Sequence, residues 1–236
     1  MKLNVMTFNT QHCENFKTKK IDFDCIADVI LQFSPDIVGL NEMRMDGVNP
    51  EYTDQIPELA RKGRYPNWYF AKALDVGGQN PYGNGFLSRY PIISAETIPV
   101  PDPVEKKYTG HYETRCLLHA KIDIPGGLDV FVIHFGLNPD EQANAVKTVV
   151  KNITAQRCIL MGDFNVLPED PVLETIRERM YDTAVLFKKE LFSFPSDKPN
   201  IKIDYIFTSK DIKVLSADIP QIVASDHCPY IASVEI

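Results

Sequence analysis

A chain of 236 residues can form one large domain or two small ones, and 44% hydrophobic with 24% charged residues are ordinary values for a folded protein, which excludes wholesale disorder. Its 25 basic and 32 acidic residues give a net charge of −7, which argues against a protein held to nucleic acid or to a membrane by bulk positive charge. An acidic site that binds phosphate through metal cations remains compatible with this charge.

The N-terminal quarter predicts a strand–helix–strand unit. A short apolar strand begins at residue 3 and ends at Asn9. Apolar residues with helical spacing follow from Cys25 to Phe33, and the helix must stop there because the residue before Pro35 is pushed out of the helical region. The next apolar run has the length of a buried strand and leads directly to Glu42.

A β-hairpin is predicted in the middle of the chain. Apolar and polar residues alternate from Cys116 to Ile124, which is the period of a half-buried strand. The turn residues 125–127 separate this strand from a second one, apolar on both faces, over residues 128–135. Because so few residues join the two strands, we expect them to pair antiparallel.

A second strand–helix–strand unit completes this pattern. Its helix is expected to begin near Asn138, with Pro139 at the first position and Glu141 placed for a capping box. A short buried strand follows at residues 158–161. Since both halves follow one plan and no linker separates them, we expect a single domain over residues 1–236.

The five cysteines are scattered, odd in number and without a C-x-x-C pair, which indicates neither a zinc site nor a disulfide framework. The first residues turn polar too soon for a secretory signal, and no apolar run approaches the ~18 residues that a membrane span needs. We therefore expect a reduced, soluble, cytoplasmic protein, with a monomer as the default state.

Side chains of Asn, Asp, Glu and His gather at or near the ends of apolar runs: Asn9, Glu42, His134, Asp163, Asn165, Asp204, Asp226 and His227. One such residue usually just satisfies the backbone of a turn, but this many together favour a site. The hard oxygen donors suit Mg²⁺ or Mn²⁺ better than zinc, and the imidazoles can serve proton transfer. The set fits metal-assisted attack of water on a phosphoester, although spacing alone does not show that the groups converge.

Six short motifs occur in a fixed order: Thr7-Phe8-Asn9, Leu40-Asn41-Glu42-Met43, Val132-Ile133-His134, Gly162-Asp163-Phe164-Asn165, Ile203-Asp204-Tyr205-Ile206-Phe207 and Ser225-Asp226-His227. With them the chain, from Thr7 to His227, resembles the endonuclease/exonuclease/phosphatase superfamily of deoxyribonuclease-I-like, metal-dependent phosphoesterases. One motif alone would be weak evidence, whereas six in family order are specific. The resemblance implies an α+β fold, a four-layer α/β/β/α sandwich of two packed mixed β-sheets flanked by helices.

The resemblance also implies which residues bind the cation and the phosphate. Glu42 would be the principal ligand of Mg²⁺ or Mn²⁺, with Asn9 and Asp226 in the same cation site. Asn84 and Arg115 would be secondary phosphate contacts.

The resemblance further implies a role for each catalytic residue. Asp163 would position or deprotonate the attacking water, and Asn165 would hold the phosphate or the transition-state oxygen. His134 would donate to a phosphate oxygen. Asp204 would orient His227, which would act either as a general base or as a protonated phosphate clamp, and the sequence leaves both roles open.

Three other histidines and one departure from the family pattern bear on the site. His12 and His111 could reach it from loops, whereas His119 is expected on a strand or at the surface. Asn41 stands where many family members carry Gln, which removes no catalytic group.

The leading hypothesis is a phosphoesterase that acts on a small or lipid-derived phosphodiester or on a phosphomonoester, because the chain is acidic and has no long basic arm. A nuclease acting on DNA or RNA is the alternative, and an inactive scaffold of the same fold is the third. Trp68 is the single tryptophan, which argues against an exonuclease-III-like repair enzyme. Two irregular segments, 74–81 and 99–113, are expected to select the phosphate-ester substrate.

Overall fold

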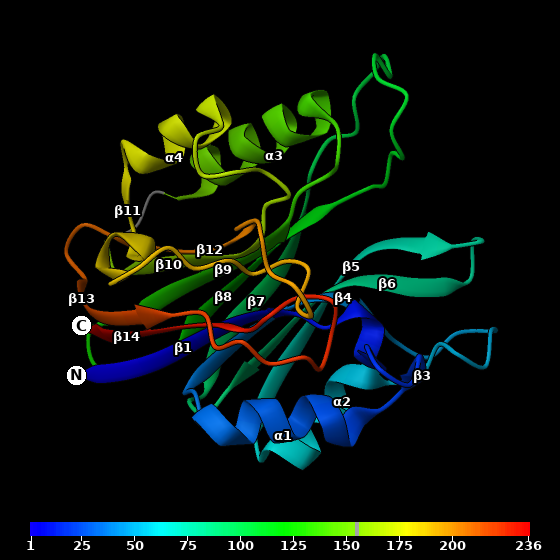
Figure 1. Ribbon diagram of the computed structural model, residues 1–236, viewed down its shortest axis with the longest axis horizontal. Coiled ribbons are helices and arrows are strands. Elements are labelled where there is room, and N and C mark those ends of the chain that lie inside the picture. The colour runs from blue at the N-terminus through cyan, green and yellow to red at the C-terminus, as the bar shows by residue number, and fades with distance from the viewer. Residues whose placement is uncertain (154–155) are drawn as a thin grey trace.

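The computed structural model describes residues 1–153 and 156–236 and places two six-stranded sheets face to face (Figure 1). In spatial order, the first sheet contains β13 (Lys213–Asp218), β14 (Tyr230–Glu235), β1 (Lys2–Asn9), β4 (Ile37–Arg44), β6 (Asn80–Ser88) and β5 (Asn67–Val76). The second contains β11 (Met180–Asp182), β12 (Asp204–Ser209), β10 (Cys158–Asp163), β9 (Leu128–His134), β8 (Cys116–Ile122) and β7 (Ile92–Pro99). A small pair lies outside both sheets, β2 (Glu14–Asn15) with β3 (Lys20–Ile21).

Helices cover the outer face of each sheet. The first sheet is covered by α1 (Phe23–Phe33) and α2 (Gln55–Gly63), and the second by α3 (Pro139–Asn152) and α4 (Glu174–Arg177) (Figure 1). Single 3₁₀ turns are η1 (Gln11–Cys13), η2 (Pro171–Leu173) and η3 (Thr183–Leu186). The architecture is therefore the expected four-layer α/β/β/α sandwich, and none of the described helices is long and apolar enough to cross a bilayer.

The alternation of side chains along each strand builds the layers. On β1, Val5 faces the core between the sheets, whereas Met6 and Phe8 pack under the helices with Ile26 and Ile30 of α1. On the other side, Val146 and Val149 of α3 pack on the outward-facing apolar residues of β8 and β9. The parallel strands β1, β4, β9 and β10 are thus largely buried on both faces, as their continuous apolar runs predict.

The predicted units are present. β1, α1 and β4 form the first strand–helix–strand unit, with β1 and β4 parallel, and β9, α3 and β10 form the second, with β9 and β10 parallel. β8 and β9 form the expected antiparallel hairpin. Helix α3 begins after Asn138, whose backbone N–H donates to the Glu141 carboxylate at 3.1 Å, as the capping box predicts.

One expected loop is instead mostly strand. Residues 74–81 belong to the long hairpin of β5 and β6, so that only residues 77–79 lie outside the strands. Gly77 and Gly78 have φ of +61° and +82°, so they mark a tight turn rather than an extended irregular segment. The segment 99–113 is irregular as expected, beyond Pro99 at the end of β7.

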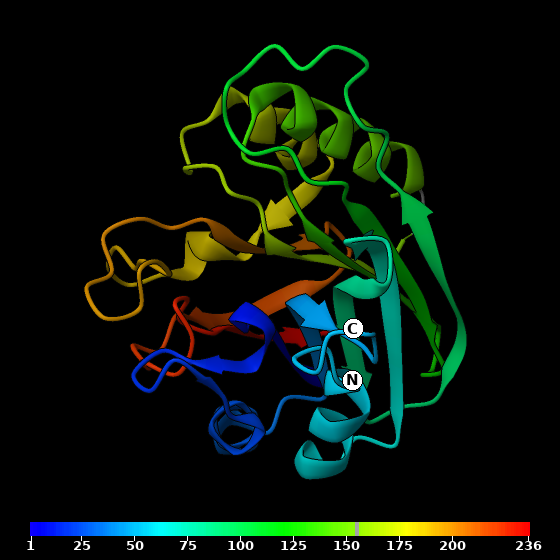
Figure 2. The same ribbon diagram turned by 90° about the vertical axis from the view of Figure 1, so that its right-hand side faces the viewer.

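Strand directions bring the polar strand ends to one side of the sandwich. The carboxyl ends of the parallel strands β1 and β4, and of β9 and β10, lie on this side, and β12 and β14 begin there because they run antiparallel to β10 and β1. Figure 2 looks onto this end, which the segment 99–113, the β5–β6 turn and the loop before β12 surround.

Candidate active site

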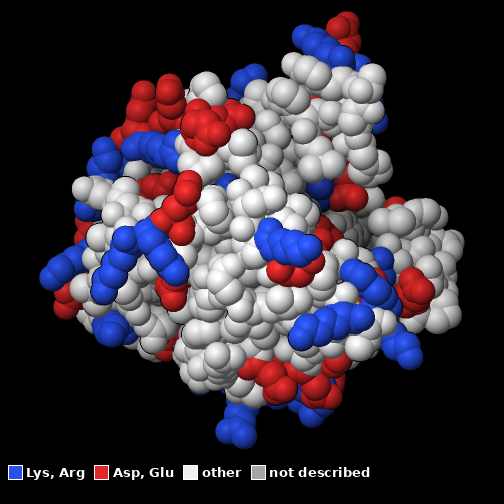
Figure 3. Space-filling view, in the orientation of Figure 1, with Lys and Arg blue, Asp and Glu red and all other residues white. Residues whose placement is uncertain are grey.

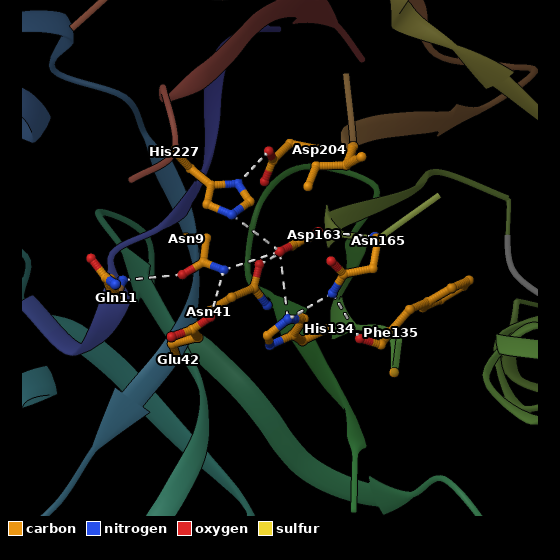
Figure 4. Close-up of polar contacts among 12 residues, drawn as sticks. Asn9, Gln11, Asn41, Glu42, His134, Phe135, Asp163, Asn165, Asp204 and His227 are labelled. Carbon is orange, nitrogen blue, oxygen red and sulfur yellow. Dashed lines mark hydrogen bonds and ion pairs between the residues drawn. The ribbon is translucent and has the colours of Figure 1, made fainter. Parts of the chain in front are cut away.

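The residues that the sequence predicts for catalysis and metal binding converge at this end of the two sheets; Figure 4 shows all of them except Asp226, whose charge acts on Glu42 and His227. They stand within strands, at their ends or within a few residues of them: Asn9, Glu42, His134, Asp163, Asn165, Asp204, Asp226 and His227. Hydrogen bonds and close polar contacts connect all of these except Asp226 into one network. The Asp226 carboxylate instead accepts from Ser225 Oγ at 3.0 Å.

A bulge in β4 directs Glu42 into the site. The pairing of β4 with β6 shifts between Leu40 and Met43, and Glu42 has a φ of +62° in the left-handed region. A non-glycine residue there costs about 1–3 kcal/mol, so the surrounding strands must hold it in place. Bulges of this kind re-aim a side chain. Here the bulge places Glu42 beside Asn9, whose amide nitrogen donates to Glu42 Oε1 at 3.0 Å.

The Glu42 carboxylate is suited to a divalent cation. Burial raises its pKa, and the charge of Asp226 raises it further, although the hydrogen bond from Asn9 lowers it. His12 Nδ1 lies 3.9 Å from Glu42 Oε2 but does not neutralise it, because burial and the charge of Arg44 lower the pKa of His12 to about 4. Hard oxygen donors with an unneutralised charge fit Mg²⁺ or Mn²⁺.

Asn9 links the cation side of the site to the catalytic side. Its amide nitrogen donates both to Glu42 and to Asp163 Oδ2, at 3.0 Å each, while its carbonyl oxygen accepts from the backbone N–H of Gln11 at 3.1 Å. The structure therefore shows Asn9 orienting two carboxylates through its nitrogen.

His227 lies between two buried carboxylates. Its Nδ1 donates to Asp204 Oδ2 at 2.8 Å, and its Nε2 lies 3.5 Å from Asp163 Oδ2. Burial lowers the pKa of His227, but the charges of Asp204 and Asp163 outweigh it and raise the value to about 10. Both ring nitrogens are then protonated, and the ring is an imidazolium.

Burial and charge act on the pKa of Asp163 in the opposite directions from those at His227. Burial raises the pKa of Asp163 to about 7, against the lowering effect of the His227 charge. Oxygen and nitrogen atoms of Asp163, Asp204 and His227 all lie within 4.8 Å of one another, a spacing that a metal ion could use. An imidazolium has no lone pair for a metal, so a cation could use His227 as a ligand only after this ring loses a proton.

His134 and Asn165 lie on the other side of Asp163. His134 Nε2 lies 3.5 Å from Asp163 Oδ2 and 3.1 Å from the Asn165 amide nitrogen, which also donates to the backbone oxygen of Phe135 at 3.1 Å. Asn165 has a φ of +51° and its backbone N–H donates to Asp163 Oδ1 at 2.9 Å. Burial and the charge of Arg115 hold the pKa of His134 well below its usual range.

Asn84, which the resemblance implies as a secondary phosphate contact, is buried and hydrogen-bonded within the protein. The residue is 2% exposed, and both the oxygen and the nitrogen of its amide form hydrogen bonds. The oxygen accepts from the Asn41 amide nitrogen at 2.9 Å, and the nitrogen donates to Cys116 O at 2.9 Å. Asn41 in turn accepts from the backbone N–H of Asp163 at 2.9 Å. Asn84 and Asn41 therefore form a brace between the two sheets that supports Asp163.

The remaining histidines separate into two groups. His12, in the left-handed stretch Gln11–Cys13, reaches the site beside Glu42. His111 is exposed, and His119 is held between Glu96 and Asp129 on the second sheet and stacks on a phenylalanine.

Some residues that touch the site carry no sequence signal. Phe194 packs at 4.9 Å from the His227 ring, and Glu113 forms an ion pair with Arg115. Both stand in irregular segments, where no periodicity indicates a direction for the side chain. Asn41 does carry a signal, because it lies next to Glu42 in a family motif.

The brace leads to a prediction about stability. Asn84→Ala is expected to lower the free energy of unfolding by about 2 kcal/mol, because one buried N–H of the Asn41 amide and the Cys116 carbonyl lose the partner that Asn84 supplies. Urea denaturation measures the free energy of unfolding, with the exposed Asn200→Ala as the matched control. Equal urea midpoints for Asn84→Ala and Asn200→Ala would contradict the brace.

The amino-acid sequence matches a known protein family over nearly its whole length. Residues 6–227 match the family described as the endonuclease/exonuclease/phosphatase family. The search of curated proteins finds no match.

Solved structures share the fold. A protein of this family from Beutenbergia cavernae is 23% identical, with a TM-score of 0.82, and the alignment covers 100% of this chain and 72% of that one. A mannosyl-6-phosphatase from Bacteroides thetaiotaomicron is 14% identical, with a TM-score of 0.78 over 99% and 100% of the two chains. D. rerio TDP2 in complex with a single-strand DNA product is 16% identical, with a TM-score of 0.71 over 100% and 99%.

Proposed function

We propose that this chain, which belongs to the endonuclease/exonuclease/phosphatase family, is a divalent-metal-dependent phosphoesterase that cleaves a P–O bond by in-line attack of water. The observation that carries the proposal is the environment of Asp163. This buried carboxylate has a pKa of about 7 and stands between the His227 imidazolium and the amide nitrogen of Asn9. A carboxylate tuned to neutral pH is suited to accept a proton from water.

The side chains around Asp163 suggest the remaining steps. Asp163 takes the proton of the attacking water, and the charged His227, held by Asp204, stabilises the negative charge on the phosphate. Asn165 and His134 donate to a phosphoryl oxygen as charge develops on it. For His227, the role of a protonated phosphate clamp is favoured over that of a general base, because a ring with a pKa of about 10 is already protonated and has no lone pair to accept a proton.

Glu42 would be the principal ligand of the cation, with Asn9 and Asp226 in the same cation site, where the Asn9 amide nitrogen also orients Glu42. When bound, a divalent cation supplies Lewis-acid polarisation of the phosphate and neutralises part of its charge. Mg²⁺ and Mn²⁺ both fit these donors.

A small or lipid-derived phosphodiester or a phosphomonoester is our proposed substrate class. The chain has a net charge of −7, and the face seen in Figure 3, at a right angle to the end that carries the site, has acidic and basic side chains side by side without a continuous basic surface. The likeness to a mannosyl-6-phosphatase supports this class, while the likeness to TDP2 with its DNA product supports the alternative, a nuclease. We further propose one catalytic domain over residues 1–236 that acts as a monomer, and a cytoplasmic location, based on the free cysteines.

Metal removal tests the proposal. After dialysis against EDTA, hydrolysis is expected to stop, and Mg²⁺ or Mn²⁺ should restore it while Ca²⁺ restores less, because Ca²⁺ prefers a larger coordination shell. The assay panel contains p-nitrophenyl phosphate, bis-p-nitrophenyl phosphate, sphingomyelin, inositol phosphates, RNA, and single- and double-stranded DNA.

The panel also separates the alternatives. Rates on DNA or RNA far above those on the small esters would favour the nuclease. No turnover on any substrate, with no heat released on Mn²⁺ titration, would indicate an inactive scaffold.

A further inference from the structure

The guanidinium of Arg115 contacts His134. Arg115 Nη1 lies 3.0 Å from His134 Nδ1, and the two residues are 9% and 4% exposed. The contact follows from the hairpin, in which Leu117 of β8 lies opposite Ile133 of β9, so that the residue before β8 comes alongside the last residue of β9. An ion pair from Glu113 to the same Nη1 atom holds the guanidinium in place.

This contact determines which nitrogen of His134 carries the hydrogen. A guanidinium has only N–H donors and stays charged at every physiological pH. His134 Nδ1 must therefore accept from Arg115 with its lone pair, which leaves the hydrogen of the neutral ring on Nε2. The lowered pKa of His134 agrees with a neutral ring.

The Nε2 hydrogen lies next to a second donor. Asn165 must direct its amide nitrogen toward Phe135, because the backbone oxygen there can only accept. The His134 and Asn165 nitrogens, 3.1 Å apart, are then both donors. Two N–H groups at this spacing do not bond to each other, but both can donate to a single oxygen anion that binds between them.

We propose that Arg115 is a positioning residue that fixes His134 as the neutral tautomer with its hydrogen on Nε2. His134 and Asn165 then present two donors to one phosphoryl oxygen, a step that rests on the proposed function. The tautomer itself is a property of the free protein. The charged and titratable groups that face His134 are Arg115 at Nδ1, Asp163, whose Oδ2 lies 3.5 Å from Nε2, and His227. As long as Arg115 occupies Nδ1, the ring takes no second proton, so this donor pair does not change with pH near neutrality.

The tautomer can be read by NMR without any substrate. Protein labelled with ¹⁵N-histidine gives long-range ¹H–¹⁵N correlations for each ring, and comparison with His134→Gln assigns the signals of His134. We expect a protonated Nε2 and an unprotonated Nδ1, unchanged from about pH 5.5 to about pH 8.5. A hydrogen on Nδ1, or an imidazolium forming in this range, would overturn the proposal.

Variants of Arg115 test the cause. Arg115→Met has no donor, so His134 is expected to populate both tautomers or to titrate, whereas Arg115→Lys still donates to Nδ1 and should keep the wild-type tautomer. A wild-type tautomer in Arg115→Met would overturn the role of Arg115. Should that variant fail to fold, the wild-type spectrum still decides, because it alone shows which nitrogen is protonated.

Kinetics distinguish positioning from direct phosphate binding. With p-nitrophenyl phosphate or its bis ester, Arg115→Met is expected to lower kcat about thirtyfold and to change KM by less than about threefold. A large rise in KM at unchanged kcat would instead make Arg115 a phosphate contact and overturn the proposal. An enzyme inactive on all phosphate esters would refute the proposed function, while the NMR result would still stand.

Discussion

Replacing Glu42 with glutamine is expected to lower turnover about a thousandfold, equivalent to ~4 kcal/mol of transition-state stabilisation, and to weaken Mn²⁺ binding. Glutamine keeps the size of the side chain and an oxygen that can accept from Asn9, so the change removes mainly the negative charge. That charge, with Asp226, is what the proposed cation site offers.

The same substitution should not unfold the metal-free protein. Because the pKa of Glu42 is raised in the folded state, ionisation of this carboxylate opposes folding above its ordinary pKa. Glu42→Gln removes this cost, so the metal-free variant should melt at the wild-type temperature or above it. The control is Glu178→Gln, the same change at an exposed position after α4.

Two measurements decide the outcome. Calorimetric titration with Mn²⁺ reports the affinity, and steady-state turnover at several Mn²⁺ concentrations shows whether excess metal restores the rate. Wild-type turnover and affinity in Glu42→Gln would remove Glu42 from the cation site.

The layers and the location of the site follow from periodicity and strand order. Asn9 and His134 end strands whose parallel partners are buried on both faces, and such strands must carry their polar residues where the apolar run stops. The parallel pairing of β1 with β4 and of β9 with β10 then brings these ends together, as the resemblance implies.

What the sequence does not predict depends on contacts between distant segments. The bulge that directs Glu42 arises from the pairing of β4 with β6, and glutamate itself has no preference for a left-handed backbone. Asn84 carries a polar side chain that is typical of a binding site, but its neighbours Asn41 and Cys116 use both ends of the amide. Burial of this kind depends on packing of the two sheets and has no local signature.

The contacts of Arg115 also depend on packing that the sequence does not predict. Arginine in a phosphoesterase motif predicts a phosphate contact, because guanidinium and phosphate are complementary. Only the β8–β9 register shows that one N–H donor of the Arg115 guanidinium is already used by His134 Nδ1.

A second large effect is expected for Asp204→Asn, which should lower kcat at neutral pH by at least about a hundredfold, or ~3 kcal/mol. Asparagine can still accept from His227 Nδ1 through its oxygen, so the ring keeps its place and loses the neighbouring charge. Without that charge the pKa of His227 is expected to fall, because only the charges of Asp163 and Asp226 then oppose the effect of burial. A neutral ring beside Asp163 stabilises neither its carboxylate nor the phosphate.

The pH dependence of the rate shows in which direction Asp204→Asn moves the pKa of Asp163. Proton uptake by Asp163 requires the ionised carboxylate, so the rate should rise with pH through the pKa of Asp163, about 7 in the wild type. Asp204→Asn removes a charge that raises this pKa and, by neutralising His227, a charge that lowers it. Since the effect of His227 is the larger of the two, the rise in rate should move to higher pH.

A second Asp–His pair in the same protein provides the matched control. Asp129 Oδ1 lies 2.5 Å from His119 Nε2 on the second sheet, so Asp129→Asn weakens an equivalent pair away from the site. Its pH–rate profile should coincide with the wild-type profile, while that of Asp204→Asn should be lower and displaced toward alkaline pH. Equal profiles for all three proteins would show that His227 acts without help from Asp204, whereas a displacement toward acid would mean that His227 does not stabilise the Asp163 carboxylate.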